Sequence, residues 1–143
     1  MSSVRALDFG RAFYLTSDSE QAARWARTTV LRRGEGRAVV SVYEFDEAAA
    51  SALSMLRFDA PNSAWLRYVM RNRTGMSVDV DYDIVSGPVA NDNTMPVLNL
   101  YFKGAYSEEE ALRRLLPQRL KDQFAMKTDA ALSCLRFLEG RVV

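Results

Sequence analysis

The sequence predicts a single α+β domain. Short apolar segments of two periods alternate along the chain: some repeat every second residue, as strands do, and others every three to four residues, as helices do. Their spacing is too irregular for a doubly wound parallel sheet, and no internal repeat, low-complexity tract or linker interrupts them. A length of 143 residues suits one domain, so we expect residues 1–143 to fold as one unit.

The first part of the chain carries the clearest local signals. Residues 13–16 have the pattern of a strand and are entered through a glycine turn at Gly10. The next segment, SDSE, is typical of a capping box, so we expect Ser17 to cap a helix that runs through Arg32. Residues 37–45, RAVVSVYEF, are rich in β-branched and aromatic side chains and predict a strand.

Similar signals place the remaining elements. Helices are expected where a capping residue precedes an apolar stripe of helical period, and strands where short apolar runs end at glycine or proline. In chain order, we expect a short helix capped by Asp46, a strand at 55–58, a helix capped by Asn62, a strand at 82–85, a helix opened by residues 91–94 and ending at Gly104, a helix capped by Ser107, a strand at 123–127 and a helix capped by Thr128 that reaches Leu138.

The apolar faces of these elements define the expected core. Cys134 lies within one such face, and a lone cysteine in a chain without histidine is expected to be a small core residue. The other residues expected to be buried are Trp25, Val40, Leu66, Ile84, Leu98, Leu132 and Leu135.

Composition excludes several reaction classes. The chain contains no histidine, which rules out Ser-His-Asp and Cys-His catalysis and a histidine-ligated zinc site. One cysteine rules out a four-cysteine zinc site, and no spaced Asp/Asn/Gly loop suggests calcium, so we expect no metal. Nineteen basic and 18 acidic residues give a net charge of +1, which favours neither nucleic acid nor an anionic membrane as an electrostatic partner.

Targeting signals are not apparent in the sequence. It has no basic-then-apolar leader and no run of about 18 apolar residues, and its one cysteine permits no internal disulfide. We therefore expect a cytoplasmic protein that makes no membrane contact.

Five segments then occur in a fixed order: DFGRAFYLTSDSEQAARWA, VVSVYEFDE, LRFDAPNSAWLRYVMRNR, DYDIVSGPVANDN and LKDQFAMKTDAALSCLRFLE. Together they closely resemble a bacterial family of unknown function marked by Asp-Phe-Gly-x-Gly-Phe-Tyr-Leu-Thr. The resemblance covers about residues 7–138. That family looks like a member of the ADP-ribosyltransferase-like superfamily, whose split β-sheet, flanked by helices, holds NAD in a cleft.

The resemblance implies NAD as the substrate. Cleavage of the nicotinamide–ribose bond builds positive charge on the ribose, so catalysis needs an immobilised NAD, an aromatic wall and a group that holds the ribose hydroxyls. Nicotinamide leaves as a neutral group, so a site without histidine is not incompetent for this reaction. The NAD-binding set that the resemblance implies is Asp8, Phe9, Gly10, Phe13, Tyr14 and Thr16.

Within this set, Tyr14 would stack on the nicotinamide with Phe13 facing the core, or the reverse, because neighbours on a strand point to opposite faces. Gly10 would let the backbone approach the ligand, and Asp8 would fix the loop or bond the ribose. The residue types by themselves also permit a structural interpretation, in which Phe13 and Tyr14 are core strand residues and Asp8 caps a turn.

Gln123 occupies the late strand on which the superfamily usually keeps its catalytic glutamate. The resemblance makes it a candidate catalytic residue together with Tyr14, although a glutamine supplies no negative charge to the ribose cation. An ordinary polar strand residue is the alternative for Gln123. Asp83, Asn91 and Asp92 surround a turn, where we expect them to cap the loop.

The chain also departs from the family pattern. Relatives usually begin with a Tyr-His-Gly strand, whereas this chain reads MSSVRALDFG and is expected to be shortened at its N-terminus. The second glycine of the hallmark is Ala12, and the usual Phe-His-Thr is replaced by Met126, Lys127 and Thr128.

Two functions follow from the resemblance. One is an NAD-dependent mono-ADP-ribosyltransferase, a toxin or effector component, whose acceptor is either a protein or a nucleic acid. The other is a catalytically silent module of the same fold that pairs with an antitoxin-like protein or a full-length relative.

Overall fold

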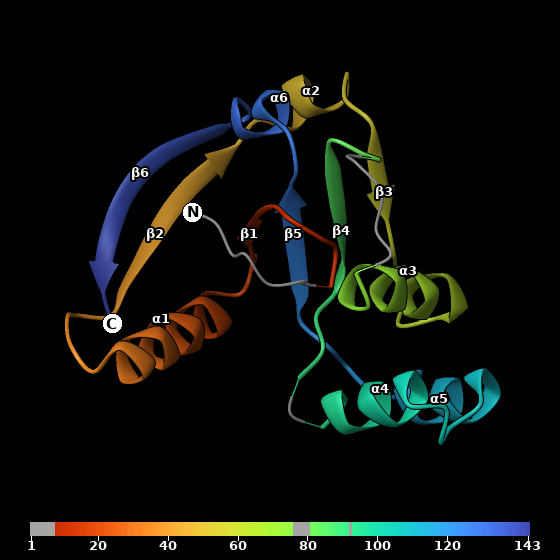
Figure 1. Ribbon diagram of the computed structural model, residues 1–143. Coiled ribbons are helices and arrows are strands. Elements are labelled where there is room, and N and C mark those ends of the chain that lie inside the picture. Colours follow the sequence, from red (N-terminus) through yellow and green to blue (C-terminus); the bar gives the residue numbers. More distant parts are fainter. Residues whose placement is uncertain (1–7, 76–80, 92) are drawn as a thin grey trace.

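Two β-sheets organise the computed structural model, which describes residues 8–75, 81–91 and 93–143 (Figure 1). These residues form an α+β fold. In chain order the elements are β1 (Phe13–Leu15), α1 (Ser19–Arg33), β2 (Val39–Phe45), α2 (Glu47–Ala50), β3 (Met55–Arg57), α3 (Ser63–Arg73), β4 (Ile84–Pro88), α4 (Met95–Phe102), α5 (Glu108–Leu115), β5 (Asp122–Met126), α6 (Asp129–Leu132) and β6 (Leu135–Val142).

The larger sheet has four strands in the order β1-β5-β4-β3. Its β1–β5 and β4–β5 pairs are antiparallel, and its β3–β4 pair is parallel. The smaller sheet is an antiparallel ribbon of β2 and β6, with a register shift between Val42 and Tyr43. Figure 1 shows this ribbon arching away from the larger sheet, with α1 near its far end and the short helices α2 and α6 where the two sheets meet.

The two faces of the larger sheet carry separate apolar clusters. Tyr14 pairs with Ala125 across β1 and β5, and both belong to the cluster that contains α3 residues such as the fully buried Trp65. Their neighbours Phe13 and Met126 also pair, but they belong to the cluster that contains the ribbon residues. The alternation of strand side chains therefore separates these clusters onto opposite faces of the sheet.

The predicted cap of α1 is wrong by one residue. Asp18, not Ser17, is the N-cap, and its carboxylate accepts from the Gln21 N–H at 2.8 Å. The Ser17 N–H and hydroxyl instead donate to the carboxylate of Asp122 on β5. A long-range acceptor thus engages Ser17, and an aspartate that caps equally well takes its place.

The helix predicted to reach Leu138 is also wrong. Thr128 caps α6 as expected, but this helix ends at Leu132 and Leu135 begins β6. Residues of β6 pair with β2 along seven positions, from Phe45–Leu135 to Val39–Val142. This tertiary pairing overrides a local apolar spacing that had suggested a helix.

The expected core is confirmed in part. Leu66, Ile84, Leu98 and Cys134 are buried. Trp25, Val40, Leu132 and Leu135 are only half-buried, and three of these four border a groove between α1 and the ribbon.

Two smaller predictions shift in position. The strand expected at 82–85 is β4, which begins at Ile84 and continues through the Gly87-Pro88 pair that was expected to be a turn. Asn91 caps its loop by accepting from the Thr94 N–H at 3.0 Å, whereas Asp92 and the segment before Asp8 lie outside the described residues. No helix in the described part of the chain is both long and apolar enough to cross a membrane.

Candidate functional site

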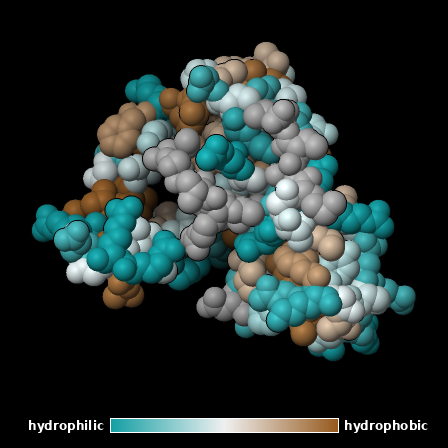
Figure 2. Space-filling view, viewed as in Figure 1, coloured by the Kyte–Doolittle hydropathy of each residue, from teal (hydrophilic) through white to brown (hydrophobic). Residues whose placement is uncertain are grey.

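A groove of about 730 Å³ lies between α1, β1 and the β2–β6 ribbon. Its volume falls within the range of about 300–1,000 Å³ that small-molecule sites occupy. Figure 2 shows the surface hollowed between α1 and the ribbon. The residues that line the groove from α1 and β2 are Ser19, Ala22, Trp25, Ala26, Thr29, residues 39–43 and Phe45.

Aromatic side chains form much of the groove wall. Phe13 and Tyr43 meet edge to face, with ring centroids 5.8 Å apart and an interplanar angle of 82°. Trp25 projects from α1 and Phe124 from β5 into the same lining. The groove therefore offers several rings to a flat ligand, which is the arrangement that favours stacking or edge contacts.

Polar groups are sparser in this lining. Among the residues that line the groove, Glu47 is the one carboxylate and Arg141 the one cation. Glu47 lies at the start of α2, where it is exposed. Several hydroxyls are added by Thr16, Ser17, Ser19, Thr29 and Ser41.

The opposite face of the larger sheet carries a buried polar network. Asp8 forms an ion pair with Arg73 of α3 and accepts a hydrogen bond from the Gln123 amide at 3.2 Å. The side chain of Asn72 donates to the Asp8 carbonyl at 3.3 Å. Asp8 and Gln123 are each only 4% exposed, so these bonds replace water for both side chains.

The Tyr14 hydroxyl holds the loop that contains Phe9 and Gly10 by two hydrogen bonds. It donates to the Gly10 carbonyl and accepts from the Phe9 N–H at 3.1 Å. Burial of the phenol raises the pKa of Tyr14 well above the usual tyrosine value, and this exceeds the lowering by the Phe9 N–H. The hydroxyl therefore stays protonated and serves as a structural donor.

Gly10 fits this loop for two reasons. Its φ of 86° lies in the left-handed region, which disfavours residues with a Cβ atom. A Cβ atom added there would also lie 3.0 Å from the Asn72 amide oxygen. The glycine thus lets the loop approach α3 closely.

A second polar cluster flanks this network. The Lys127 ammonium contacts the Asp81 carboxylate at 2.8 Å and the Tyr68 hydroxyl at 3.0 Å, and Tyr68 in turn donates to Asp81 at 2.8 Å. Burial would raise the pKa of Asp81, but the hydrogen bonds from Lys127 and Tyr68 lower it below the usual aspartate value. Asp81 therefore stays charged and compensates the buried lysine.

The residues predicted from the sequence divide between these two regions. Asp8, Gly10, Tyr14 and Gln123 do lie together, but as two hydrogen-bonded pairs, Tyr14 with Gly10 and Gln123 with Asp8. Of these four residues, Asp8, Gly10 and Gln123 do not line the groove. Phe9 is fully buried, with its ring centroid 5.9 Å from that of Tyr68.

Three predicted residues, Phe13, Tyr14 and Thr16, do line the groove. Most of the other lining residues were not predicted as site residues, among them the aromatic residues Trp25, Tyr43 and Phe124 and the carboxylate Glu47. Only Trp25 could have been found from the sequence. It lies on the apolar face of the helix that follows the strand at residues 13–16, within the segment that carried the family resemblance.

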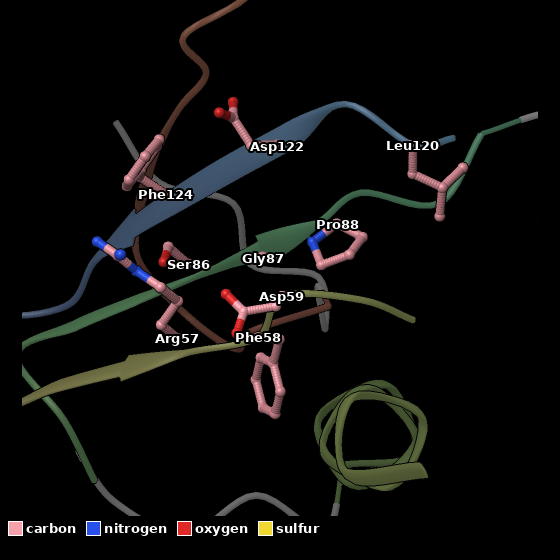
Figure 3. Close-up of a pocket in the computed structure, with 9 residues that line it drawn as sticks. All are labelled: Arg57, Phe58, Asp59, Ser86, Gly87, Pro88, Leu120, Asp122 and Phe124. Carbon is pink, nitrogen blue, oxygen red and sulfur yellow. The ribbon is translucent and has the colours of Figure 1, made fainter. Parts of the chain in front are cut away.

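A smaller cavity of about 310 Å³ adjoins the larger sheet beyond Phe124, which lines both spaces. Figure 3 shows Arg57, Ser86 and Asp59 around it. Asp122 at its rim accepts from Thr16 and Ser17, and both of these residues line the groove. The two spaces are therefore neighbours along one face of the sheet.

The fold and groove define a small α+β protein with an aromatic ligand-sized site on one face of its larger sheet. Comparison with protein families gives a match over residues 1–137 to the family described as "Protein of unknown function (DUF3990)", and the chain belongs to this family. No curated protein and no solved structure matches the chain.

Proposed function

We propose that this chain is an ADP-ribosyltransferase-like protein that binds NAD in the groove and cleaves its nicotinamide–ribose bond. The observation that carries the proposal is the origin of the lining. Of the 21 residues that line the groove, nine belong to residues 8–26, the segment with the strongest family resemblance. They are Phe13, Tyr14, Leu15, Thr16, Ser17, Ser19, Ala22, Trp25 and Ala26.

The aromatic wall supports binding of the nicotinamide ring. Phe13 and Tyr43 hold each other edge to face, which limits their rotation, and Trp25 faces the same space from α1. A ring held between such groups loses rotational freedom on binding, and this immobilisation is a large part of what the reaction needs.

The charge distribution suggests a different catalytic residue from the one expected. As the C–N bond breaks, its electron pair leaves with neutral nicotinamide and positive charge develops on the ribose. A nearby carboxylate stabilises that charge, and Glu47 is the carboxylate in the lining. Water or an acceptor group then bonds to the ribose carbon and releases its proton to solvent.

Gln123 receives a positioning role in this proposal. Its amide donates to Asp8 on the face away from the groove, so it supports the loop that leads into β1. The same observation favours a second candidate, the catalytically silent module. If the reaction depends on Gln123 contacting ribose, a glutamine engaged with Asp8 is not free to do so.

Calorimetric titration with NAD tests the binding step. Trp25→Ala should weaken binding about 5- to 150-fold, the range expected when a base loses an aromatic stacking partner. Leu31→Ala is the matched control, because Leu31 lies on the same helix, is 82% exposed and does not line the groove. Equal affinities for both variants would place NAD elsewhere, and no binding by the unaltered chain would remove the NAD-cleaving function and leave the silent module.

Release of nicotinamide, followed by chromatography, tests the chemical step. Glu47→Gln should reduce the rate at least about tenfold while the dissociation constant for NAD stays the same. Glu20→Gln is the control, an exposed α1 carboxylate outside the groove. Binding by the unaltered chain without any nicotinamide release would support the silent module.

A further inference from the structure

Among the residues that the structure describes, one edge of β6 has no partner strand. The strand pairs on one side with β2, and the smaller sheet contains these two strands in the described part of the chain. Its side chains are unusually exposed for an apolar strand: Phe137 is 58% exposed, Leu138 47% and Val142 62%. Such an edge offers unpaired N–H and C=O groups together with apolar side chains, which favours pairing with another strand.

The backbone groups that face outward can be identified. The Val143 N–H donates to the Ala38 carbonyl at 2.9 Å, so the polar groups of this residue point toward β2. Hydrogen-bonding direction alternates along an antiparallel strand, and Arg141 and Glu139 therefore also point toward β2. The groups of Val142 and Gly140 consequently point away from β2, toward the free edge. Leu138 has no partner in β2, because the register shifts between the pairs Val42–Glu139 and Tyr43–Phe137, so the alternation extends only from residue 139 to residue 143.

We propose that two copies of this chain associate through β6, antiparallel about a two-fold axis at Gly140, to form a continuous β2-β6-β6-β2 sheet. In this register Gly140 faces the same residue of the second copy, and Leu138 faces the second copy's Val142. Glu139 faces the second copy's Arg141, and the reverse contact forms by symmetry. The register pairs the outward-facing Gly140 of one copy with the outward-facing Gly140 of the other, as antiparallel hydrogen bonding requires.

The pattern of side chains selects both this register and this partner. Residues 138–142 read apolar, acidic, glycine, basic, apolar, so the segment is complementary to itself when its direction is reversed. Sliding one strand by two residues in either direction would place Glu139 opposite Glu139 or Arg141 opposite Arg141. Like charges directly opposite each other are destabilising, whereas opposite charges stabilise an antiparallel pair.

The charged residues are already arranged for this contact. Glu139 and Arg141 form an ion pair within β6, which shows that both side chains lie on the same face of the strand. Pairing would extend this contact to a cluster of four alternating charges. Residues 138–143 lie beyond the match to the family, so the proposed pairing depends neither on that match nor on the proposed enzymatic function.

Sedimentation velocity over a concentration series at low salt tests the proposal. The unaltered chain should dimerise, and Glu139→Arg and Arg141→Glu should each raise the dimer dissociation constant at least about tenfold. The double variant E139R/R141E should recover the dimer, because the exchanged charges are again self-complementary. Arg113→Glu on α5 is the control for a charge reversal at an exposed site.

A backbone variant provides an independent measurement. Val142→Pro removes an N–H that faces outward, so it should abolish the dimer while the thermal unfolding of the monomer shows a folded chain. A monomer at every concentration would overturn the proposal, and so would a dimer that none of these variants affects. Dissociation by the single variants without recovery in E139R/R141E would also overturn it and indicate a different partner strand.

Discussion

The two faces of the larger sheet use polar residues in opposite ways. On one face, Asp8 and Gln123 are buried, and Asp8 is bonded to both Gln123 and the half-buried Arg73, so these polar groups are occupied within the chain. On the other face, Glu47 and Arg141 border an open groove. A residue type that looks catalytic in a sequence can therefore be structural, and the test is whether its polar atoms already have partners.

The largest effect should come from breaking the ion pair between Arg73 and the buried Asp8. Arg73→Ala leaves the Asp8 carboxylate uncompensated, and we expect a loss of about 3–5 kcal/mol in the free energy of unfolding, measured by denaturant titration. Arg67→Ala breaks an exposed pair with Glu108, where Arg67 is 69% exposed, and should cost less than about 1 kcal/mol. Similar losses for both variants would show that the Arg73–Asp8 pair contributes no more to stability than an exposed ion pair does.

Gln123→Glu tests whether residue 123 is a structural or a catalytic residue. The family resemblance suggests that a glutamate here would restore activity, but the structure places the side chain against Asp8. A second buried carboxyl would repel Asp8 or remain protonated, so we expect a loss of about 2–4 kcal/mol and no gain in nicotinamide release. A stable variant with increased release would return the catalytic role to Gln123.

Acid should selectively weaken the second cluster of the network face. The pKa of Asp81 is lowered in the folded chain, so its stabilising contribution is complete above the unfolded pKa of about 4 and is lost as pH falls below it. Asp81→Asn should cost about 1.5–3 kcal/mol at pH 7, and the difference from the unaltered chain should shrink toward pH 3. Unfolding titrations across this range measure it, and a constant difference would contradict the assignment.

Substitutions at two glycines should distinguish the cost of backbone strain from the cost of lost close packing. Gly10 and Gly104 both have positive φ, 86° and 82°, but only Gly10 has Asn72 within 4 Å of an added Cβ atom. Gly104→Ala should cost about 1 kcal/mol for its backbone conformation, and Gly10→Ala roughly 1 kcal/mol more because the loop must move away from α3. Equal unfolding free energies would mean that the loop relaxes freely.

Much of the fold could be predicted because its signals are local. The strand at β2 and the caps at Asp46, Asn62 and Ser107 depend on residues close in the sequence, and the structure confirms them. The strand β6 could not be predicted, because its conformation depends on a partner strand about 90 residues earlier in the chain. Local spacing favoured a helix there.

The site was harder to predict than the fold. The family resemblance assigned Asp8 and Gln123, which are 115 residues apart, to one NAD site, but it did not indicate that their side chains hydrogen-bond to each other. Trp25 and Tyr43 have the apolar character of core residues, and only the separation of α1 from the ribbon turns them into a groove wall. Residue types fix what a side chain can do, whereas long-range packing decides whether it is exposed to a ligand.

The smallest effect on stability should occur in the groove. Glu47 is exposed, lies in the first turn of α2, and is not needed for the cap that Asp46 provides by accepting from the Ala49 N–H. Glu47→Gln keeps the size of the side chain and removes only its charge, so we expect a change within about 0.5 kcal/mol in unfolding free energy. The same variant should strongly slow nicotinamide release, and this pairing of effects is the reverse of that expected for Gln123→Glu. A large loss of stability in Glu47→Gln would instead assign Glu47 to the structure of the α2 turn and leave the groove without a carboxylate for the ribose cation.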